Sequence, residues 1–526
     1  MTVPFPRRTL MGGLAGLAGT ATVLHRARAA GLKVLVGAID EDPPIINPGI
    51  SSASTAYVAG APTYSGLAWT DVNGNLHPDL AERWDVSADG RIITFHLRSG
   101  VVWHDGKPFT ARDAQYSLSE LTAKLHPSAK GAYRALDGID APDERTVVIR
   151  MKAPAAVFLK VPTAIWPILP RHIWEGSDIP RNPANKRPVG TGPFRMIEYN
   201  AGDSIRYVRN EHYHMPGQPG FDELILRIIP DASARVSAYE NGNVDILFNN
   251  AVPATEIPRL LRVPGTELRT ARMPGGAFMG IINSRSRPYG DTMVRRALAH
   301  AIDRAFIRAN VLPGISEAML GPLPPSSPLY DRTLVDYAHD PALANKILDD
   351  AGYARDASGI RFPFRFLWAG GDIRVTKMGD VIAQNLAAVG IKTILRPLDH
   401  AALISIGYVR GEFDMIVDSY ALGPDPDIGV ERLYNSANIL PLPFVNNCGY
   451  ANPEVDRMFD LQRTQTDLVE RRASYAQIQK MIWADVPTLP ICAYSAPVVV
   501  RTSYVADSFT NWNTTGEDFA RAKPRA

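Results

Sequence analysis

Short hydrophobic runs bounded by turn residues predict strands along the first half of the chain. These runs, rich in Val, Ile, Leu and Phe, fall at residues 33–39, 91–98, 145–151 and 221–229. Thr110 and Asp113 have the spacing of a capping box, which predicts a helix over residues 111–123. Asp231 follows the last of these runs directly and is placed to cap another helix.

Helical and strand patterns alternate more regularly in the second half. A helix over residues 291–307 is predicted from an Asp291 cap and one apolar stripe, formed by Met293, Val294, Ala297, Leu298, Ala301 and Ile302. Further helices are expected from Asp340-Pro341 to Gly352 and over 374–390, and a strand is expected over 391–396. This alternation predicts a partly parallel α/β sheet, in which ligands bind beyond the carboxyl ends of the strands.

One such strand end carries two carboxylates. The segment FDMIVDSYALGPDPDIGVERLY, residues 413–434, predicts a strand over 413–420 and then a turn containing Asp425 and Asp427. Gly, Pro and Asp are ordinary turn residues, so an exposed turn is one interpretation. The other is a pocket rim that binds a cationic or hydroxylated group.

Composition places the chain among water-soluble multidomain proteins. At 526 residues the chain is too long for one core, which predicts two or three domains. It is 45% hydrophobic and 21% charged, as is typical of globular proteins.

The N-terminus has the pattern of an export signal over residues 1–29. Arg7 and Arg8 precede an uncharged stretch, and Ala27-Arg28-Ala29 fits a cleavage site, so the segment resembles a twin-arginine signal. It carries four arginines and no acid, so cleavage lowers the formal net charge of +2 by four, to −2. A mature protein of this charge is not expected to bind nucleic acid electrostatically. No other segment is long and apolar enough to predict a membrane span.

The positions of the cysteines indicate in which cellular compartment the protein is expected. The chain has two cysteines, Cys448 and Cys492, and neither lies in the leader, where a lipoprotein would need one. We therefore expect a freely released protein in the periplasm. There the two cysteines could form a disulfide or be two buried small side chains, and both alternatives remain open.

Motifs for catalysis are absent from the sequence. Residues 100–108, GVVWHDGKP, depart from a phosphate-binding loop in spacing and in having Pro108 where Ser or Thr is needed. Neither a G-x-S-x-G elbow nor an H-E-x-x-H zinc helix occurs. His212 and His214 lie in a polar loop and are expected to be hydrated. We expect a binding protein without a cofactor or metal, and not an enzyme.

Four long segments, in order, resemble the extracellular solute-binding proteins of family 5. They are residues 80–118, with WHDGKPFTARD, and residues 188–214, 227–246 and 449–459. The family includes the dipeptide, oligopeptide and nickel receptors of ATP-driven importers. The resemblance implies that His104 and Asp105 are structural, and that RNEHYH, residues 209–214, is a structural loop.

The resemblance also implies a fold. The expectation is an α/β, two-lobed periplasmic-binding-protein-like architecture with mixed sheets in each lobe and an extra small domain in the first. Lobe I would comprise residues 30–70, 190–280 and 491–526, the extra domain 71–189, and lobe II 281–490.

The implied function is that of a monomeric periplasmic receptor of an ABC transporter. It would capture a peptide or peptide-like solute between its lobes and deliver it to a membrane permease. Alternatives are a non-peptide solute such as an opine or sugar conjugate, a metal or haem carrier, and an exported hydrolase.

The loop after residue 420 departs from the family pattern. Peptide-binding members typically have D-Y-x-D-P here, and the first Asp pairs with the α-ammonium of the ligand. Aligning D-P on Asp425-Pro426 puts Leu422 at that position. Asp418 and Asp427 are the nearest substitutes, with Asp418 expected on the same face of the strand as Tyr420. Asp425 is expected to brace the turn.

Candidate pocket walls are aromatic and amide side chains near strand ends. They are Tyr64, Phe278, Trp368, Tyr420, Asn446, Asn447 and Trp512. Arg374 is a candidate partner for a ligand carboxylate. Residues 276–283 are expected to form a strand by which the chain crosses between the lobes, and the backbone of this strand could bind an extended ligand. Each aromatic or amide residue has an alternative interpretation as core or turn.

Overall fold

The computed structural model describes residues 31–525 except 52, 72–74, 127–128, 130–132, 134, 153–165, 249–250, 272–275, 371–372, 400–401, 423–424, 466 and 506–517. The predicted export signal lies outside the described residues. The chain forms two compact units. Unit 1 contains residues up to 271 and from 496 onward, and unit 2 contains residues 272–495.

A seven-stranded mixed sheet organises unit 1. Its order is β12 (Thr266–Ala271), β19 (Ala496–Arg501), β11 (Ile246–Phe248), β1 (Val34–Ile39), β10 (Glu223–Ile228), β9 (Ser204–Arg209) and β8 (Phe194–Asn200). β1 pairs in parallel with both β10 and β11, and every residue of β1 and β10 is buried. The hydrophobic runs therefore predicted the central strands, because a strand covered on both faces needs apolar side chains throughout.

Unit 1 has a second, antiparallel sheet. Its order is β4 (Ala81–Val86), β5 (Ile92–Leu97), β7 (Thr146–Met151) and β6 (Leu136–Asp140). The capping box of Thr110 and Asp113 is confirmed and starts α3 (Ala111–Tyr116). The helix continues through a π-helical segment, η1 (Ser117–Thr122), into α4 (Ala123–Leu125). Phe95, Leu118 and Val147 belong to the core between them.

A six-stranded mixed sheet organises unit 2. Its order is β14 (Ser316–Glu317), β18 (Thr488–Tyr494), β13 (Gly276–Ile282), β17 (Met415–Ala421), β15 (Phe362–Ala369) and β16 (Ile391–Leu398). β15 is parallel to β16 and β17, whereas β13 is antiparallel to β17 and β18. The predicted partly parallel sheet is confirmed, with β17 near its centre.

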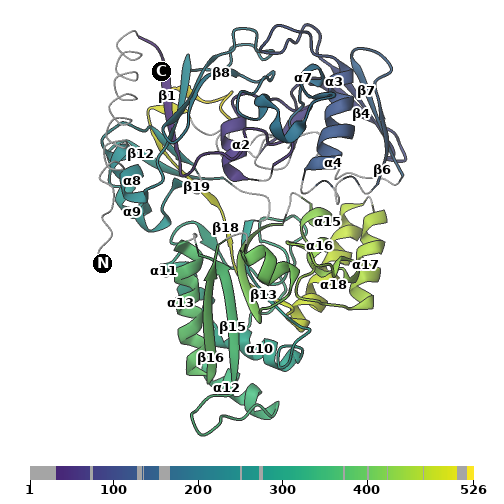
Figure 1. Ribbon diagram of the computed structural model, residues 1–526. Helices are drawn as coiled ribbons and strands as arrows, with labels where there is room; N and C mark the ends of the chain where they lie inside the picture. The colour runs from purple at the N-terminus through teal and green to yellow at the C-terminus, as the bar shows by residue number, and fades with distance from the viewer. Residues whose placement is uncertain are drawn as a thin grey trace, which may run out of the picture. The chain divides into compact units, whose positions relative to one another are not determined.

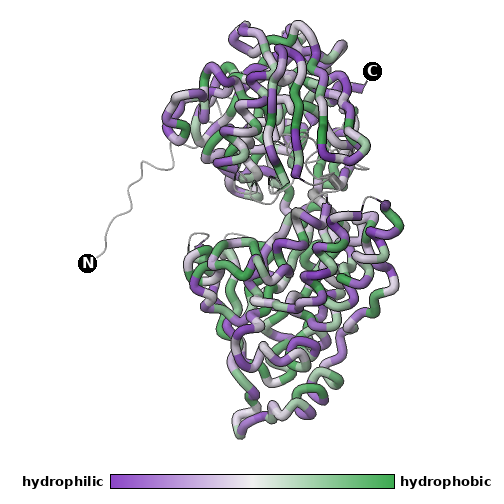
Figure 2. The backbone as a smooth tube through the Cα atoms, turned by 90° about the vertical axis from the view of Figure 1, so that its right-hand side faces the viewer, coloured by the Kyte–Doolittle hydropathy of each residue, from purple (hydrophilic) through white to green (hydrophobic). Residues whose placement is uncertain are grey.

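Helices pack on both faces of this sheet. α10 (Thr292–Ala301), α11 (Arg304–Asn310), α12 (Pro341–Asp350) and α13 (Ile373–Ala388) gather on one side, and α17 (Pro453–Thr464) and α18 (Leu468–Asp485) on the other (Figure 1). Hydrophobic and hydrophilic stretches alternate along the backbone of both units (Figure 2). Met279, Ile416 and Tyr420 from the strands share one core cluster with Phe459 of α17 and Tyr475 of α18.

Shorter elements complete the two units. They are α2 (Ser54–Gly60), β2 (Ala68–Thr70), β3 (Leu76–Pro78), α7 (Arg171–Trp174), η2 (Ile179–Arg181), η3 (Pro183–Asn185), α8 (Ala232–Glu240), η5 (Ala254–Glu256), α9 (Ile257–Leu260), η6 (Leu403–Val409), α15 (Pro426–Gly429), α16 (Glu431–Tyr434), η7 (Ser436–Asn438), β20 (Tyr504–Val505) and β21 (Lys523–Pro524). Asp231 caps α8 as predicted, by accepting a hydrogen bond from the Ala234 backbone.

The helix predicted over residues 291–307 is two helices, so this prediction was wrong. Ile302 leaves the helical conformation, with φ −89° and ψ 120°, and α11 begins after Asp303. The carboxylate of Asp303 accepts a hydrogen bond of 2.8 Å from the Phe306 backbone N–H. The apolar stripe continues through the break because Ile302 and Ile307 are both buried, which concealed the break in the sequence pattern.

The break gives a direct test of this cap. We predict that Asp303→Ala lowers the free energy of unfolding by about 1 kcal/mol, because the first turn of α11 loses its side-chain acceptor. Asp303→Asn keeps an acceptor at the same place and serves as the matched control. Urea unfolding of both variants checks the prediction, and equal losses in the two would contradict it.

Candidate functional site

Strand β17 divides its side chains between the two faces of the unit 2 sheet. Asp418 lies opposite Met279 of β13, and Ser419 lies opposite Phe278. Because side chains alternate along a strand, Asp418 and Tyr420 share one face and Ser419 points to the other. The prediction that Asp418 and Tyr420 lie on the same face is confirmed by a tyrosine that contacts both.

That tyrosine is Tyr408, from η6. Its hydroxyl donates a 2.8 Å hydrogen bond to Oδ2 of Asp418 and lies 3.1 Å from the Tyr420 hydroxyl. Burial raises the pKa of Tyr408 and of Tyr420 well above the usual range, so both phenols stay protonated. Oδ1 of Asp418 also accepts a hydrogen bond of 2.7 Å from the Ser419 backbone. Asp418 is half-buried, whereas Tyr420 is buried.

A cation lies on two aromatic rings on the other face of the sheet. The ring centroids of Phe278 and Tyr494 are 4.7 Å apart, and the guanidinium of Arg374 lies 5.2 Å from the first and 5.9 Å from the second. Ser419 Oγ lies 2.7 Å from the Tyr494 hydroxyl. Cation–π contacts of this kind attract a guanidinium to the faces of aromatic rings. Arg374 is half-buried at the first turn of α13.

The loop after β17 is attached to α18 by an ion pair. Arg471 donates 2.7 Å and 2.6 Å hydrogen bonds to the two oxygens of Asp425, and the two side chains are only 16% and 12% exposed. Asp425 also caps α15 by accepting from the Asp427 backbone N–H. The expectation that Asp425 braces the turn is confirmed. Burial alone would lower the pKa of Arg471, but its hydrogen bonds and the charge of Asp425 raise it above the ordinary value.

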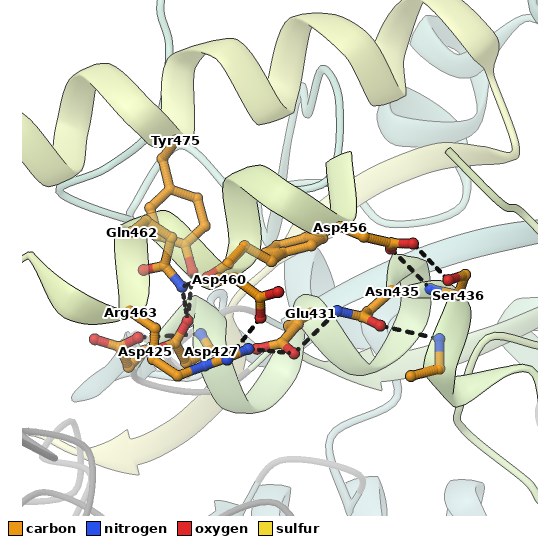
Figure 3. Close-up of polar contacts among 12 residues, drawn as sticks. Asp425, Asp427, Glu431, Asn435, Ser436, Asp456, Asp460, Gln462, Arg463 and Tyr475 are labelled. Atoms are coloured by element: carbon orange, nitrogen blue, oxygen red, sulfur yellow. Dashed lines mark hydrogen bonds and ion pairs between the residues drawn. The ribbon is translucent and has the colours of Figure 1, made fainter. Parts of the chain in front are cut away.

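Asp427 is buried beside the same pair. Its Oδ1 accepts hydrogen bonds from the Tyr475 hydroxyl, at 3.0 Å, and from the amide of Gln462 (Figure 3). Its Oδ2 lies 3.5 Å from Arg471. Burial, and next the negative charge of Asp425, raise the pKa of the Asp427 carboxyl to about 6.

The network extends into α16 and the turn after it. Arg463 of α17 donates to Glu431, at 2.7 Å, and pairs with Asp460 (Figure 3). Glu431 is 2% exposed and also accepts from Asn435. Asp456 accepts from the Ser436 backbone at 2.9 Å. Three buried carboxylates, those of Asp425, Asp427 and Glu431, thus share two guanidinium groups.

The remaining predicted pocket residues lie in several places. Tyr64, in unit 1, is 3% exposed and its hydroxyl donates to the Ile46 carbonyl. Trp368 is buried and donates from Nε1 to Thr376 Oγ1 at 3.0 Å. Asn446 and Asn447 are buried and bind backbone groups of their own loop. Trp512 lies outside the described residues.

Two of the histidines have structural hydrogen-bond partners, and the two cysteines are buried and do not form a disulfide. His104 Nε2 lies 3.0 Å from the Gly192 carbonyl, and His214 Nε2 lies 2.7 Å from Asp79. His214 therefore has a structural role, as the resemblance implies for its loop, and the expectation from the polar sequence alone that it is hydrated was wrong, because its side chain is 4% exposed. Cys448 and Cys492 are both free and buried, so the disulfide alternative is excluded. In the described part of the chain, no group of three or more His, Cys, Asp or Glu is arranged to hold a metal ion.

Sequence reasoning missed Tyr408, Arg471, Gln462 and Tyr475. Arg471 and Tyr475 are one helical turn apart on α18, and Gln462 lies on α17, so all three face the loop after β17. The helical spacing of Arg471 and Tyr475 was a visible signal. Their pairing with residues 425 and 427 could not be found from spacing.

Removing Arg471 should be costly. We predict that Arg471→Met lowers the free energy of unfolding by about 3–5 kcal/mol, because it leaves buried carboxylates without their cation. The matched control is Arg457→Met on α17, whose pair with Glu454 is 60% and 51% exposed, with an expected loss below about 1 kcal/mol. Similar small losses for the two variants in chemical denaturation would show that the Asp425 pair is dispensable.

Asp427 should give stability a pH dependence. Its pKa is about 6 in the native state against 3.8 for the ordinary carboxyl, so the native state binds the proton more tightly. The contribution of Asp427 to stability is therefore fully present below about pH 4 and is lost as the pH rises through 6. Relative to Asp427→Asn, the wild-type free energy of unfolding should fall by up to about 3 kcal/mol between pH 4 and 7.5. Parallel pH profiles of the two proteins would contradict the raised pKa.

Comparisons with known proteins agree with this architecture. The chain is 28% identical to heme-binding protein A of Haemophilus influenzae, over 94% of this chain and 93% of that protein. It is also 28% identical to di/tripeptide-binding protein 2 of Pseudomonas aeruginosa, over 92% and 94%. The structure of the oligopeptide-binding protein AppA from Bacillus subtilis, in complex with a nonapeptide, matches with a TM-score of 0.80 at 23% identity, over 94% and 99% of the two chains.

These likenesses establish the fold and the family. The fold is that of two-lobed periplasmic binding proteins, as predicted. None of the helices in the described residues combines the length and apolarity needed to cross a bilayer. The family of bacterial extracellular solute-binding proteins, family 5 (middle region), matches residues 75–440. The chain belongs to the bacterial extracellular solute-binding proteins of family 5.

Proposed function

We propose that this protein is the solute receptor of an ATP-driven importer, which captures a peptide or peptide-like small molecule between its two lobes and hands it to a membrane permease. The observation that carries the proposal is the match to family 5 over residues 75–440, together with near full-length similarity to a di/tripeptide-binding protein. The family consists of solute-binding proteins, which supports the proposal that the solute is bound and not consumed.

The chemistry around β17 narrows the solute. Leu422 occupies the position at which peptide-binding members carry the acid for the α-ammonium, and it is 1% exposed within the core of unit 2. A buried ammonium next to an apolar side chain is costly, because its charge loses water without gaining a counter-ion. Asp425 is bound on both oxygens by Arg471. These features favour a solute whose amino group is blocked, modified or absent.

A non-peptide solute is the second candidate, and the same observation favours it. The similar relatives at 28% identity have different ligands in their names, heme for one and di/tripeptides for the other. Overall similarity therefore does not select the ligand. An opine, a sugar conjugate or another small polar molecule would fit the loss of the acid at residue 422 equally well.

We propose two candidate solute contacts in unit 2, one on each face of the sheet: Asp418, on the face of Tyr420, and Arg374, on the face of Phe278. Asp418 and Arg374 are half-buried, so each is held by neighbours but keeps some surface in solvent. Asp418 would accept from a solute N–H or O–H group, and Arg374 would bind a carboxylate. Tyr64, Trp368, Asn446, Asn447, Asp427 and Trp512 are kept as proposed wall residues with less support, since all of them except Trp512 are engaged internally.

The cellular setting is also part of the proposal. Residues 1–29 would direct export, by the twin-arginine route, and the mature monomer would act in the periplasm. The lobe I, extra-domain and lobe II boundaries given above remain predictions.

Thermal unfolding of the mature protein, refolded without carried-over ligand, tests the solute class. A ligand at about 100 times its Kd stabilises the native state by roughly 2.7 kcal/mol, which gives a measurable rise in Tm. We expect N-acetylated peptides, opines or sugar conjugates to raise the Tm and free di- to pentapeptides to leave it unchanged. A rise with free peptides alone would contradict the blocked-amine inference. Turnover of any solute would contradict the receptor function.

Variants then test the two contacts. With any solute that raises the Tm, either Asp418→Asn or Arg374→Gln should weaken binding at least about tenfold, according to which face of the sheet holds the solute, because charged hydrogen bonds are the strong ones. Asp460→Asn, an exposed acid on α17 whose side chain is 72% exposed, is the matched control and should bind normally. Calorimetric titration gives the affinities, and unchanged binding by both contact variants would rule out this part of the sheet as the solute site.

A further inference from the structure

Unit 2 contains a pocket of about 350 Å³ that is separate from the end of β17. It lies where β13 ends and β17 begins, so the seven residues of β17 place it roughly 20 Å from Leu422. Its lining comes from the turn after β13, with Asn283 and Arg285, from the end of η6, with Tyr408 and Val409, and from the loop after η7, with Ile439 and Leu440. A volume of this size is in the range of small-molecule sites.

Arg285 is fixed on the polar side of this pocket. Its Nε donates to Asn283 Oδ1 at 3.2 Å, and Nη2 donates to the Asn447 carbonyl at 3.1 Å. Asn283 is itself 5% exposed and anchored to the carbonyls of Gly411 and Phe413. The arginine therefore has its orientation set by hydrogen bonds before any ligand arrives, which lowers the entropy cost of binding.

Two glycines make room for this arginine. Gly449 has φ +70°, and a Cβ there would lie 2.5 Å from Cγ of Arg285. Gly411 has φ +69°, and a Cβ there would lie 3.2 Å from Nη2. Both positions need the left-handed conformation, and at Gly449 the missing side chain also leaves room for the stem of Arg285.

The charge of the pocket is positive by one. In the described part of the chain, no carboxylate lies within ion-pair distance of Arg285, whereas Arg410 pairs with Glu412 at 3.3 Å. The opposite wall is apolar and open to solvent, since Leu440 is 41% exposed and Val409 is 43% exposed beside Ile439 and Pro441. An exposed apolar surface beside an oriented cation is suited to a ligand that has an apolar part and an anionic group.

We propose that this pocket is a second binding site, for a small monoanionic carboxylate with an aliphatic body. The carboxylate would accept hydrogen bonds from the guanidinium of Arg285, and the aliphatic part would cover Val409 and Leu440. Tyr408 forms part of the wall, and its hydroxyl is the group that contacts Asp418. The pocket is distinct from the solute contacts proposed above, because neither Asp418 nor Arg374 lines it.

The probe is 8-bromooctanoate, whose bromine can be located by anomalous diffraction in crystals of the mature protein. The bromine should lie among Val409, Ile439 and Leu440. Calorimetry should show at least about tenfold weaker binding of acetate, which lacks the aliphatic body, and of octanamide, which lacks the charge. Butyl phosphate, a dianion with a short body, should also bind more weakly than octanoate. Bromine elsewhere, or equal binding of octanamide, would overturn the proposal.

Two variants and one control separate this site from others. Arg285→Gln should weaken octanoate binding at least about tenfold, and Leu440→Asp, which leaves the Arg285 hydrogen bonds intact, should do the same by charge repulsion. Arg287→Gln is the matched control from the same turn, outside the pocket, and should bind octanoate normally. None of the three should change the Tm response to the importer solute. Octanoate affinity unchanged in both pocket variants would refute the site, whatever the outcome for the importer solute.

Discussion

The buried ion pair between Asp425 and Arg471 is the constraint on which the proposed solute site of unit 2 depends. It fixes the loop after β17 to α18, and through the Asp425 cap it also fixes the first turn of α15. Burial of a charged pair is favourable only when the remaining hydrogen-bonding capacity is used. Here Nε of Arg471 donates a hydrogen bond to the Gln462 side-chain oxygen. Tyr475 and the amide of Gln462 donate hydrogen bonds to the neighbouring Asp427.

This arrangement separates the acids of the loop by role. Asp425 and Asp427 are engaged with helices α17 and α18, so they brace the strand end. Asp418 is different, because it lies within β17 and not in the loop after it. It accepts a hydrogen bond from Tyr408 and is half-buried. Asp425 and Asp427, from which the sequence predicted a pocket rim, therefore hold the loop after β17 in place by binding to α18. Leu422, which is apolar and buried, lies between these acids in the chain, and the proposal of a solute without a free amine depends on it.

Local signals in the sequence predicted local structure well. The capping box at Thr110, the caps at Asp231 and Asp291, and the strands β1, β5, β7, β10, β16 and β17 all depend on neighbouring residues, and all are present. The break at Ile302 was missed because burial on both sides kept the apolar stripe continuous. Arg471 with Asp425 and His214 with Asp79 were missed because each pair joins residues far apart in the chain. The state of Cys448 and Cys492 also depends on tertiary placement, which spacing does not encode.

The most direct test of the receptor account is mass spectrometry of the small molecule that co-purifies with the mature protein from the periplasm of its host. The account predicts about one molecule of solute per chain, chemically unchanged on prolonged incubation, and without a free α-amino group. A free unmodified peptide would contradict the inference drawn from Leu422. A substoichiometric molecule that is converted to product would contradict the assignment as a receptor.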